Sequence, residues 1–185
     1  MQDRKSWSVQ RDNIHQELAE ILNLSSEEIG ALTALQEQAK TQAPLMVEEF
    51  YQRLFAHDNT KEYFAEASME RLHSMIADWF TELFSGSYDA QYAQKRMDIG
   101  QIHVRIGLPV RYPLAMLDII GKHGDIISAQ SANPELAKAA FHKVLAIDVA
   151  VFNQAYENSQ LEHLAELVGG ERLARLLLSG VDQTA

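Results

Sequence analysis

The chain has 185 residues, of which 46% are hydrophobic, and this length suits one domain around a single core. With 26 acidic against 16 basic residues, the formal net charge of -10 repels phosphate backbones and anionic lipid surfaces. We therefore expect neither nucleic acid nor a membrane as a partner. The lack of cysteine excludes disulfides, zinc–thiolate sites and cysteine-ligated clusters, and it suits a reducing cytoplasm.

The secondary structure is expected to be entirely helical. No stretch reaches the roughly 20 apolar residues of a membrane helix, and the polar start lacks the apolar centre of a signal peptide. The alternation of apolar and polar residues that a half-buried strand needs is absent over any long stretch. The sequence therefore predicts a soluble, cytoplasmic, all-α protein.

Apolar residues recur at helical spacing along most of the chain. The ranges in which a helix is expected are 7–24, 25–43, 44–56, 68–84, 89–106, 110–129 and 134–168. Ser25 and Glu28 have the spacing of a capping box, and Asp89 stands where an N-cap is expected. Pro44 is expected to begin a new helix, and Gly107 provides a strong stop signal.

Three segments follow from this pattern. Residues 1–24 form an N-terminal helical extension, and residues 25–168 form the main body, in which no internal repeat or linker is found. Residues 169–185 begin with two glycines and continue with a short apolar and basic stretch, which is typical of a connector. We expect this connector to lead toward an output domain outside the given sequence, and a free-standing sensor is the alternative.

One of the seven histidines differs from the rest in its setting. Most of them, His73 and His123 included, are expected on the surface. His103 is flanked at helical spacing by Ile99 and Ile106, so its imidazole lies at the edge of an apolar stripe. These residues alone leave two interpretations open. His103 is either a satisfied, partly buried side chain or a cofactor ligand, and haem iron takes a neutral histidine nitrogen.

The segment from Lys95 to Leu108 resembles the proximal helix of the globin-coupled sensors, the haem gas sensors of bacteria. The specific part is His-x-Arg-Ile-Gly-Leu, which begins at His103. The resemblance extends over residues 26–160. It implies a globin-like domain with an additional N-terminal helix, a b-type haem with His103 as the proximal metal ligand, and a homodimer formed through the last two long helices.

The resemblance also implies residues on the distal side of the haem. Phe50 and Tyr51 are similar to the family's distal aromatic pair, and a buried phenol is a hydrogen-bond donor for dioxygen or for the backbone. Leu72 and Met75 match distal-helix positions. Met75 departs from relatives that carry a hydroxyl there, which would leave Tyr51 as the sole distal donor. The expected cofactor-binding residues are His103, Tyr51, Phe50, Leu72, Met75, Ile99, Ile106 and Tyr112.

The sequence leaves the roles of several other residues undecided. Arg96 and Arg105 flank the ligand helix, either as exposed charges or as partners of a haem propionate. Asp148 falls within the apolar face of the final helix, where an ion needs a partner. Gly121 and Gly124 share one helix face, which allows close packing either inside the chain or across a dimer.

The sequence thus predicts a haem-binding sensor domain rather than an enzyme, and any enzymatic output would belong to a further domain. Its ligand is a diatomic gas, with oxygen first and carbon monoxide or nitric oxide next, and its dimer helices transmit the ligation state. One alternative is a haem-free globin-like module that responds to a partner. Another is a haem enzyme, although no acid–base pair for such chemistry is evident.

Overall fold

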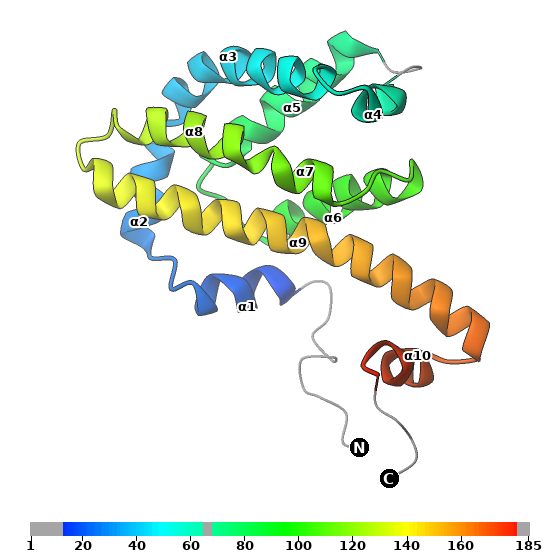
Figure 1. Cartoon of the computed structure of the whole chain (residues 1–185). Coiled ribbons are helices and arrows are strands. Elements are labelled where there is room, and N and C mark those ends of the chain that lie inside the picture. The colour runs from blue at the N-terminus through cyan, green and yellow to red at the C-terminus, as the bar shows by residue number, and fades with distance from the viewer. Residues whose placement is uncertain (1–12, 65–67, 181–185) are drawn as a thin grey trace.

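The computed structural model describes residues 13–64 and 68–180, which form helices and turns with no strand among them (Figure 1). The all-α prediction is confirmed. The helices are α1 (Ile14–Ile21), α2 (Ser26–Thr33), α3 (Gln36–Phe55), α4 (Asp58–Lys61), the 3-10 turn η3 (Glu62–Phe64), α5 (Met69–Glu82), α6 (Ala90–Arg105), α7 (Arg111–Ala115), α8 (Leu117–Ser128), α9 (Pro134–Val168) and α10 (Glu171–Leu178).

Short-range interactions fix several helix ends where the sequence predicts them. The Glu28 backbone N–H donates to the Ser25 hydroxyl at 3.2 Å, and the Ser25 N–H donates to the Glu28 carboxylate at 2.8 Å. The Asp89 carboxylate accepts from the Tyr92 N–H at 3.0 Å and caps α6. Gly107 has a φ of 71°, a left-handed conformation that ends the helix and suits glycine.

Three predicted helix boundaries are wrong. The helix expected over 25–43 ends at Thr33, and α3 begins after it at Gln36. Helix α3 continues through Pro44, which was expected to begin a new helix. Ala43, Met46 and Val47 are buried in the core, and this packing holds α3 together although proline removes one backbone hydrogen bond. The helix expected over 110–129 is instead divided into α7 and α8 at the buried Met116.

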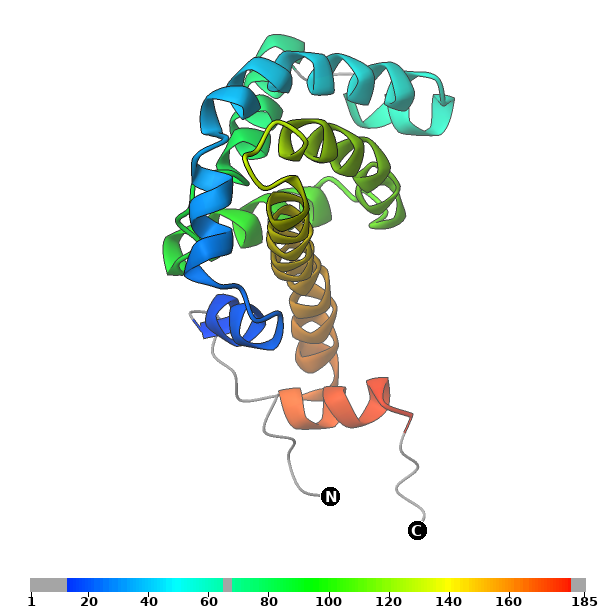
Figure 2. The same ribbon diagram turned by 90° about the vertical axis from the view of Figure 1, so that its left-hand side faces the viewer.

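Helix α9 is the axis on which the fold is assembled. Helices α1, α2, α6, α8 and α10 all contact it, while α3 packs on α5 and α8. Figure 2 looks along α9 and shows the other helices around its N-terminal half. The main core is aromatic at its centre, where the rings of Phe84 and Phe141 stack with centroids 5.4 Å apart. Gly124 leaves room for the Phe141 ring, so this glycine serves packing inside the chain.

A buried histidine joins α3 to α8. His123 is only 4% exposed, and the Gln42 amide donates to its Nδ1 at 2.8 Å. Its Nε2 lies 3.0 Å from the Glu49 carboxylate. The expectation that His123 lies on the surface is therefore wrong, because α3 covers it.

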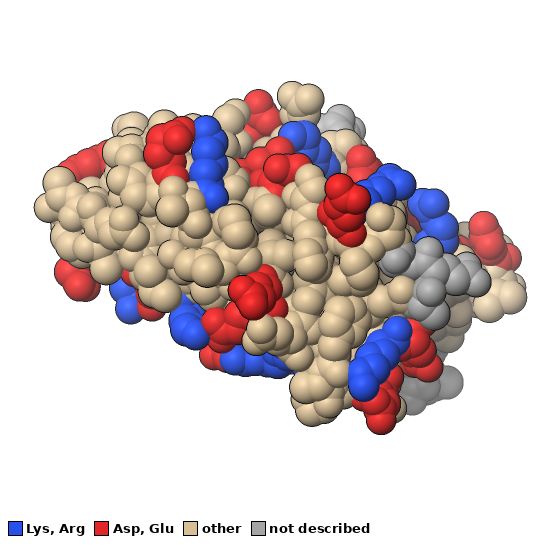
Figure 3. Space-filling model, turned by 90° about the horizontal axis from the view of Figure 1, so that it is seen from above, with Lys and Arg blue, Asp and Glu red and all other residues tan. Residues whose placement is uncertain are grey.

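On the face of the molecule that Figure 3 shows, acidic and basic side chains lie next to one another.

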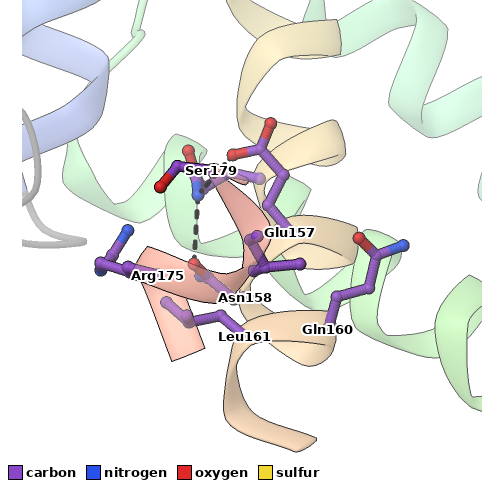
Figure 4. A pocket seen from close by; sticks show the side chains of 8 residues that line it. Glu157, Asn158, Gln160, Leu161, Arg175 and Ser179 are labelled. Atoms are coloured by element: carbon purple, nitrogen blue, oxygen red, sulfur yellow. Dashed lines mark hydrogen bonds between the residues drawn. The ribbon is translucent and has the colours of Figure 1, made fainter. Parts of the chain in front are cut away.

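The C-terminal helix α10 turns back against the end of α9, and its Ala174 is fully buried. Figure 4 shows the pocket between the two helices, where Asn158 and Leu161 of α9 lie beside Arg175 and Ser179. The beginning of the first predicted helix, at residues 7–12, lies outside the described residues. None of the described helices combines the length and apolar character needed to cross a bilayer.

Candidate cofactor site

His103 lies in the last turn of α6. One of its ring nitrogens is hydrogen-bonded, and the other has no partner among residues 13–64 and 68–180. Its Nδ1 is 2.7 Å from the carbonyl oxygen of Ile99. Because a carbonyl only accepts, Nδ1 carries the hydrogen and Nε2 keeps its lone pair. The His103 ring meets the ring of Phe152 edge-on at 5.2 Å, which restricts its orientation.

Burial also keeps this imidazole neutral. It lowers the pKa of His103, and the hydrogen bond to Ile99 offsets the shift only in part. A neutral imidazole whose Nδ1–H is held by a carbonyl is the form in which histidine binds a metal through Nε2.

Helix α9 holds the His103 helix closely on both sides of the histidine. A β-carbon built on Gly100 would come within 2.6 Å of both the Phe152 carbonyl oxygen and the Ala155 side chain, so the two backbones touch there. Beyond His103, the Tyr156 hydroxyl of α9 donates to the Leu108 carbonyl at 3.0 Å. The position of His103 is therefore set by α9.

A buried charge network anchors the beginning of the same helix. Arg96 is 1% exposed, and its Nε donates to the Asp148 carboxylate. Asp148 also accepts from the Tyr92 hydroxyl at 2.6 Å and from the Trp79 indole at 3.0 Å. The Arg96 Nη1 reaches the Glu82 carboxylate at 2.7 Å. The network joins α5, α6 and α9.

This network decides the role of Arg96 and identifies the partners of Asp148. Arg96 is not an exposed charge, because its side chain is fully buried, and its ion pairs are with Glu82 and Asp148 of this chain rather than with a propionate. Burial opposes its charge, but Asp148 and Tyr92 outweigh burial and hold the pKa of Arg96 above its ordinary value. The partners of Asp148, which the sequence did not identify, are Arg96, Tyr92 and Trp79. Arg105 is exposed, as one interpretation expected.

Tyr51 lies at the centre of an aromatic cluster on α3. Its ring stacks on Phe55 at 5.7 Å and meets Phe50 and Phe64 edge-on at 5.4 and 5.9 Å. Burial raises the pKa of Tyr51 to about 12, so the phenol stays protonated. Among residues 13–64 and 68–180 no group is hydrogen-bonded to its hydroxyl, and the alternative of a backbone partner finds no support there.

Sequence reasoning missed a neighbour of Tyr51. The His73 ring of α5 lies 4.6 Å from the Tyr51 ring, centroid to centroid, with the planes 31° apart. His73 is exposed, as expected, but its contact with the distal tyrosine was not. Its spacing along α5, on the same stripe as the buried Phe80, carried the signal.

The other predicted site residues are less enclosed. Phe50 and Leu72 are half-buried and pack against the core. Met75 is 43% exposed and Ile106 is 50% exposed. Ile99 and Tyr112 are half-buried, and the Tyr112 ring of α7 lies 6.4 Å from the Tyr63 ring in η3. This contact joins the upper helices α3 to α5 to the pair α6 and α7 below them (Figure 1).

The residues present fit a haem. One neutral imidazole nitrogen is free to bind, and one phenol hydroxyl is free to donate. Large apolar side chains on α5 and at the end of α6 also remain exposed, which an apolar macrocycle would cover. These side chains are Met75, Ile102 and Ile106.

The helix order and the half-buried histidine near the end of α6 are those of a globin domain of the sensor type. Residues 12–162 match the Protoglobin family, and the chain belongs to that family. It is 27% identical over 177 residues to the "Heme-based aerotactic transducer HemAT" of Halobacterium salinarum, with 86% of this chain and 36% of that protein covered. The chain thus spans well under half of that relative.

Solved structures agree with this assignment. The globin domain of the Geobacter sulfurreducens globin-coupled sensor has a TM-score of 0.71 at 27% identity, with 76% of this chain and 96% of that chain covered. The ferric globin domain of E. coli DosC has a TM-score of 0.63 at 18% identity, with 77% and 99% covered, and supports the fold alone. The resemblance to globin-coupled sensors is confirmed.

Proposed function

We propose that this chain is a haem-based gas-sensor domain that holds a b-type haem through His103 and binds dioxygen reversibly beside Tyr51. The observation that carries the proposal is the state of His103, which is half-buried, has a lowered pKa and is bonded through Nδ1, so that a neutral Nε2 is available. Membership of the Protoglobin family and the likeness to a heme-based transducer support haem as the group that Nε2 binds.

A haem held by His103 would supply the iron that binds a diatomic gas. The residue of this chain proposed to contact that gas is Tyr51. Its hydroxyl has no other partner in the described part of the chain, so it can donate to a gas ligand without breaking a bond. Dioxygen accepts a hydrogen bond better than carbon monoxide does, and this donor favours dioxygen by about 1–2 kcal/mol.

Transmission of the ligation state would follow α9. The His103 ring contacts Phe152, and Tyr156 holds the Leu108 carbonyl just beyond the histidine. A change in the position of His103 therefore acts directly on α9, which leads on to α10 and the segment expected to act as a connector to an output domain.

The proposed assembly is a homodimer through α8 and α9. An apolar groove along α9, next to α7 and the start of α8, supports this pairing. Its lining includes Leu114, Leu117, Leu145, Ala146, Val149 and Ala150. Introducing a charge with Val149→Arg should convert a dimer to a monomer in sedimentation velocity, and a monomeric wild type would exclude the dimer.

The first experiment is the absorption spectrum of the purified protein, reduced under argon and then exposed to oxygen, carbon monoxide or nitric oxide. We expect a Soret band that shifts reversibly with oxygen. His103→Ala should lose stable haem binding, while His163→Ala, an exposed histidine on α9, should keep it. A wild type that stays colourless with added haem would favour a haem-free module, and turnover of an added substrate would favour an enzyme.

A further inference from the structure

His73 occupies an unusual place on α5. Met69, Ile76 and Ala77 pack against the core, and Phe80 is fully buried. At 100° per residue His73 points in the same direction as these side chains, yet it remains exposed. The inward stripe of α5 is thus covered along most of its length but open at His73, beside the Tyr51 ring.

The contact with Tyr51 brings together two polar side chains that lack a protein hydrogen-bond partner in the described part of the chain. The ring centroids are 4.6 Å apart. In the part of the chain that the structure describes, neither the Tyr51 hydroxyl nor a His73 ring nitrogen has a hydrogen-bond partner. An exposed histidine needs no partner, because water serves it. The ring contact with Tyr51 is what distinguishes His73, because it places a second donor side chain next to the tyrosine.

The two side chains have complementary chemistry. The Tyr51 phenol has one donor, and a neutral imidazole has one N–H donor and one acceptor nitrogen. The ring contact, with planes tilted by 31°, limits how far the phenol can swing. His73 therefore both restricts Tyr51 and adds a second donor of its own.

We propose that His73 is a second polar residue of the gas-binding site, which packs on the Tyr51 ring and donates an imidazole N–H to dioxygen. The proposal rests on the proposed function and gives that site two donors from two helices. Tyr51 is then not the sole distal donor, although Met75 stands where relatives carry a hydroxyl. His73 determines how strongly dioxygen is preferred over carbon monoxide.

The test compares His73→Leu, which removes both nitrogens, with His73→Gln, which keeps an N–H donor. Stopped-flow dissociation rates of oxygen and carbon monoxide are measured on the haem-loaded proteins, together with the C–O stretching frequency of the carbon monoxide complex. We expect His73→Leu to release oxygen about fivefold faster, with carbon monoxide release within about twofold of wild type. The C–O frequency should rise, and His73→Gln should keep most of the wild-type behaviour.

His163→Leu is the matched control, because it replaces an exposed histidine on a different helix. The proposal is overturned if His73→Leu leaves the oxygen off-rate and the C–O frequency at wild-type values while Tyr51→Phe changes them. The same follows if the Leu and Gln variants release oxygen equally fast. A wild type without a Soret band overturns the proposed function as well, so the two failures are distinguishable.

Discussion

Gly100 of α6 lies directly against Phe152 of α9, with the Phe152 carbonyl oxygen 2.6 Å from the point a β-carbon would occupy. One helical turn later, His103 meets the ring of the same Phe152. The backbone of α9 and one of its side chains thus fix the helix and the imidazole together. The Asp148 network fixes the beginning of α6 to the same helix.

Gly100→Ala should therefore disturb both stability and haem retention. The added methyl would meet backbone, which cannot move aside as a flexible side chain can, so we expect about 1–3 kcal/mol of destabilisation. Displacement of α6 should also speed haem loss. Urea unfolding of the haem-free protein and transfer of haem to an acceptor protein measure the two effects.

The matched control is Gly30→Ala in α2, where nothing lies within 4 Å of the added carbon. It should be neutral or stabilising by up to about 1 kcal/mol, because alanine favours a helix over glycine. Equal stability changes in the two variants would contradict the close approach of α6 and α9.

Tyr51→Phe should release oxygen faster while the domain stays folded. Loss of one hydrogen bond of about 1–2 kcal/mol corresponds to a roughly 5- to 30-fold faster off-rate. The hydroxyl has no partner among the described residues, so its removal leaves no buried group unsatisfied. Carbon monoxide release is the internal control. A change of equal size for both gases would indicate altered access rather than a lost donor.

Local chemistry explains which parts of the fold are predictable from the sequence. The Ser25 side chain caps α2 by accepting a hydrogen bond from the backbone N–H of Glu28, and Gly107 ends α6 through its left-handed backbone conformation. Residues close in the sequence determine both of these helix ends. Pro44 shows the opposite case, because the packing of buried α3 residues outweighs its local preference. A break at the buried Met116 likewise has no local signature.

In the candidate site, too, some features can be predicted from the local sequence and others depend on packing between distant residues. A motif around His103 identifies the candidate ligand, but its restraint comes from Phe152, which is distant in the chain. Asp148 was recognisable as a costly buried ion, yet its partner Trp79 is 69 residues away. His73 was expected on the surface without a partner, and only the packing of α5 on α3 brings it to Tyr51.

Asp148→Ala should destabilise the protein by about 3–5 kcal/mol, because it leaves the Arg96 charge buried without one of its carboxylates. Urea unfolding measures the change. Asp118→Ala removes an exposed carboxylate paired with Arg53 and should change stability by less than about 1 kcal/mol. If the two variants lost the same stability, the buried network would not be a major stabilising element.

The pH dependence of the haem-free protein should report the burial of His103. In the unfolded chain its pKa is near the ordinary value of 6.5, and burial lowers it in the folded protein. Below about pH 6.5 the unfolded chain takes up a proton that the folded protein does not, so the free energy of unfolding falls as pH decreases. Above about pH 7 both states are neutral at this position, and His103 adds no pH dependence.

His103→Gln removes this contribution. The difference in unfolding free energy between wild type and variant should be constant above about pH 7 and should change by at most about 1.4 kcal/mol per pH unit below about pH 6.5. The wild type loses stability relative to the variant in that lower range. Urea titrations from pH 5.5 to 8 measure the difference, with His163→Gln as the control for loss of an exposed histidine. A difference that stays constant over the whole range would contradict the buried, neutral imidazole from which the proposed site is built.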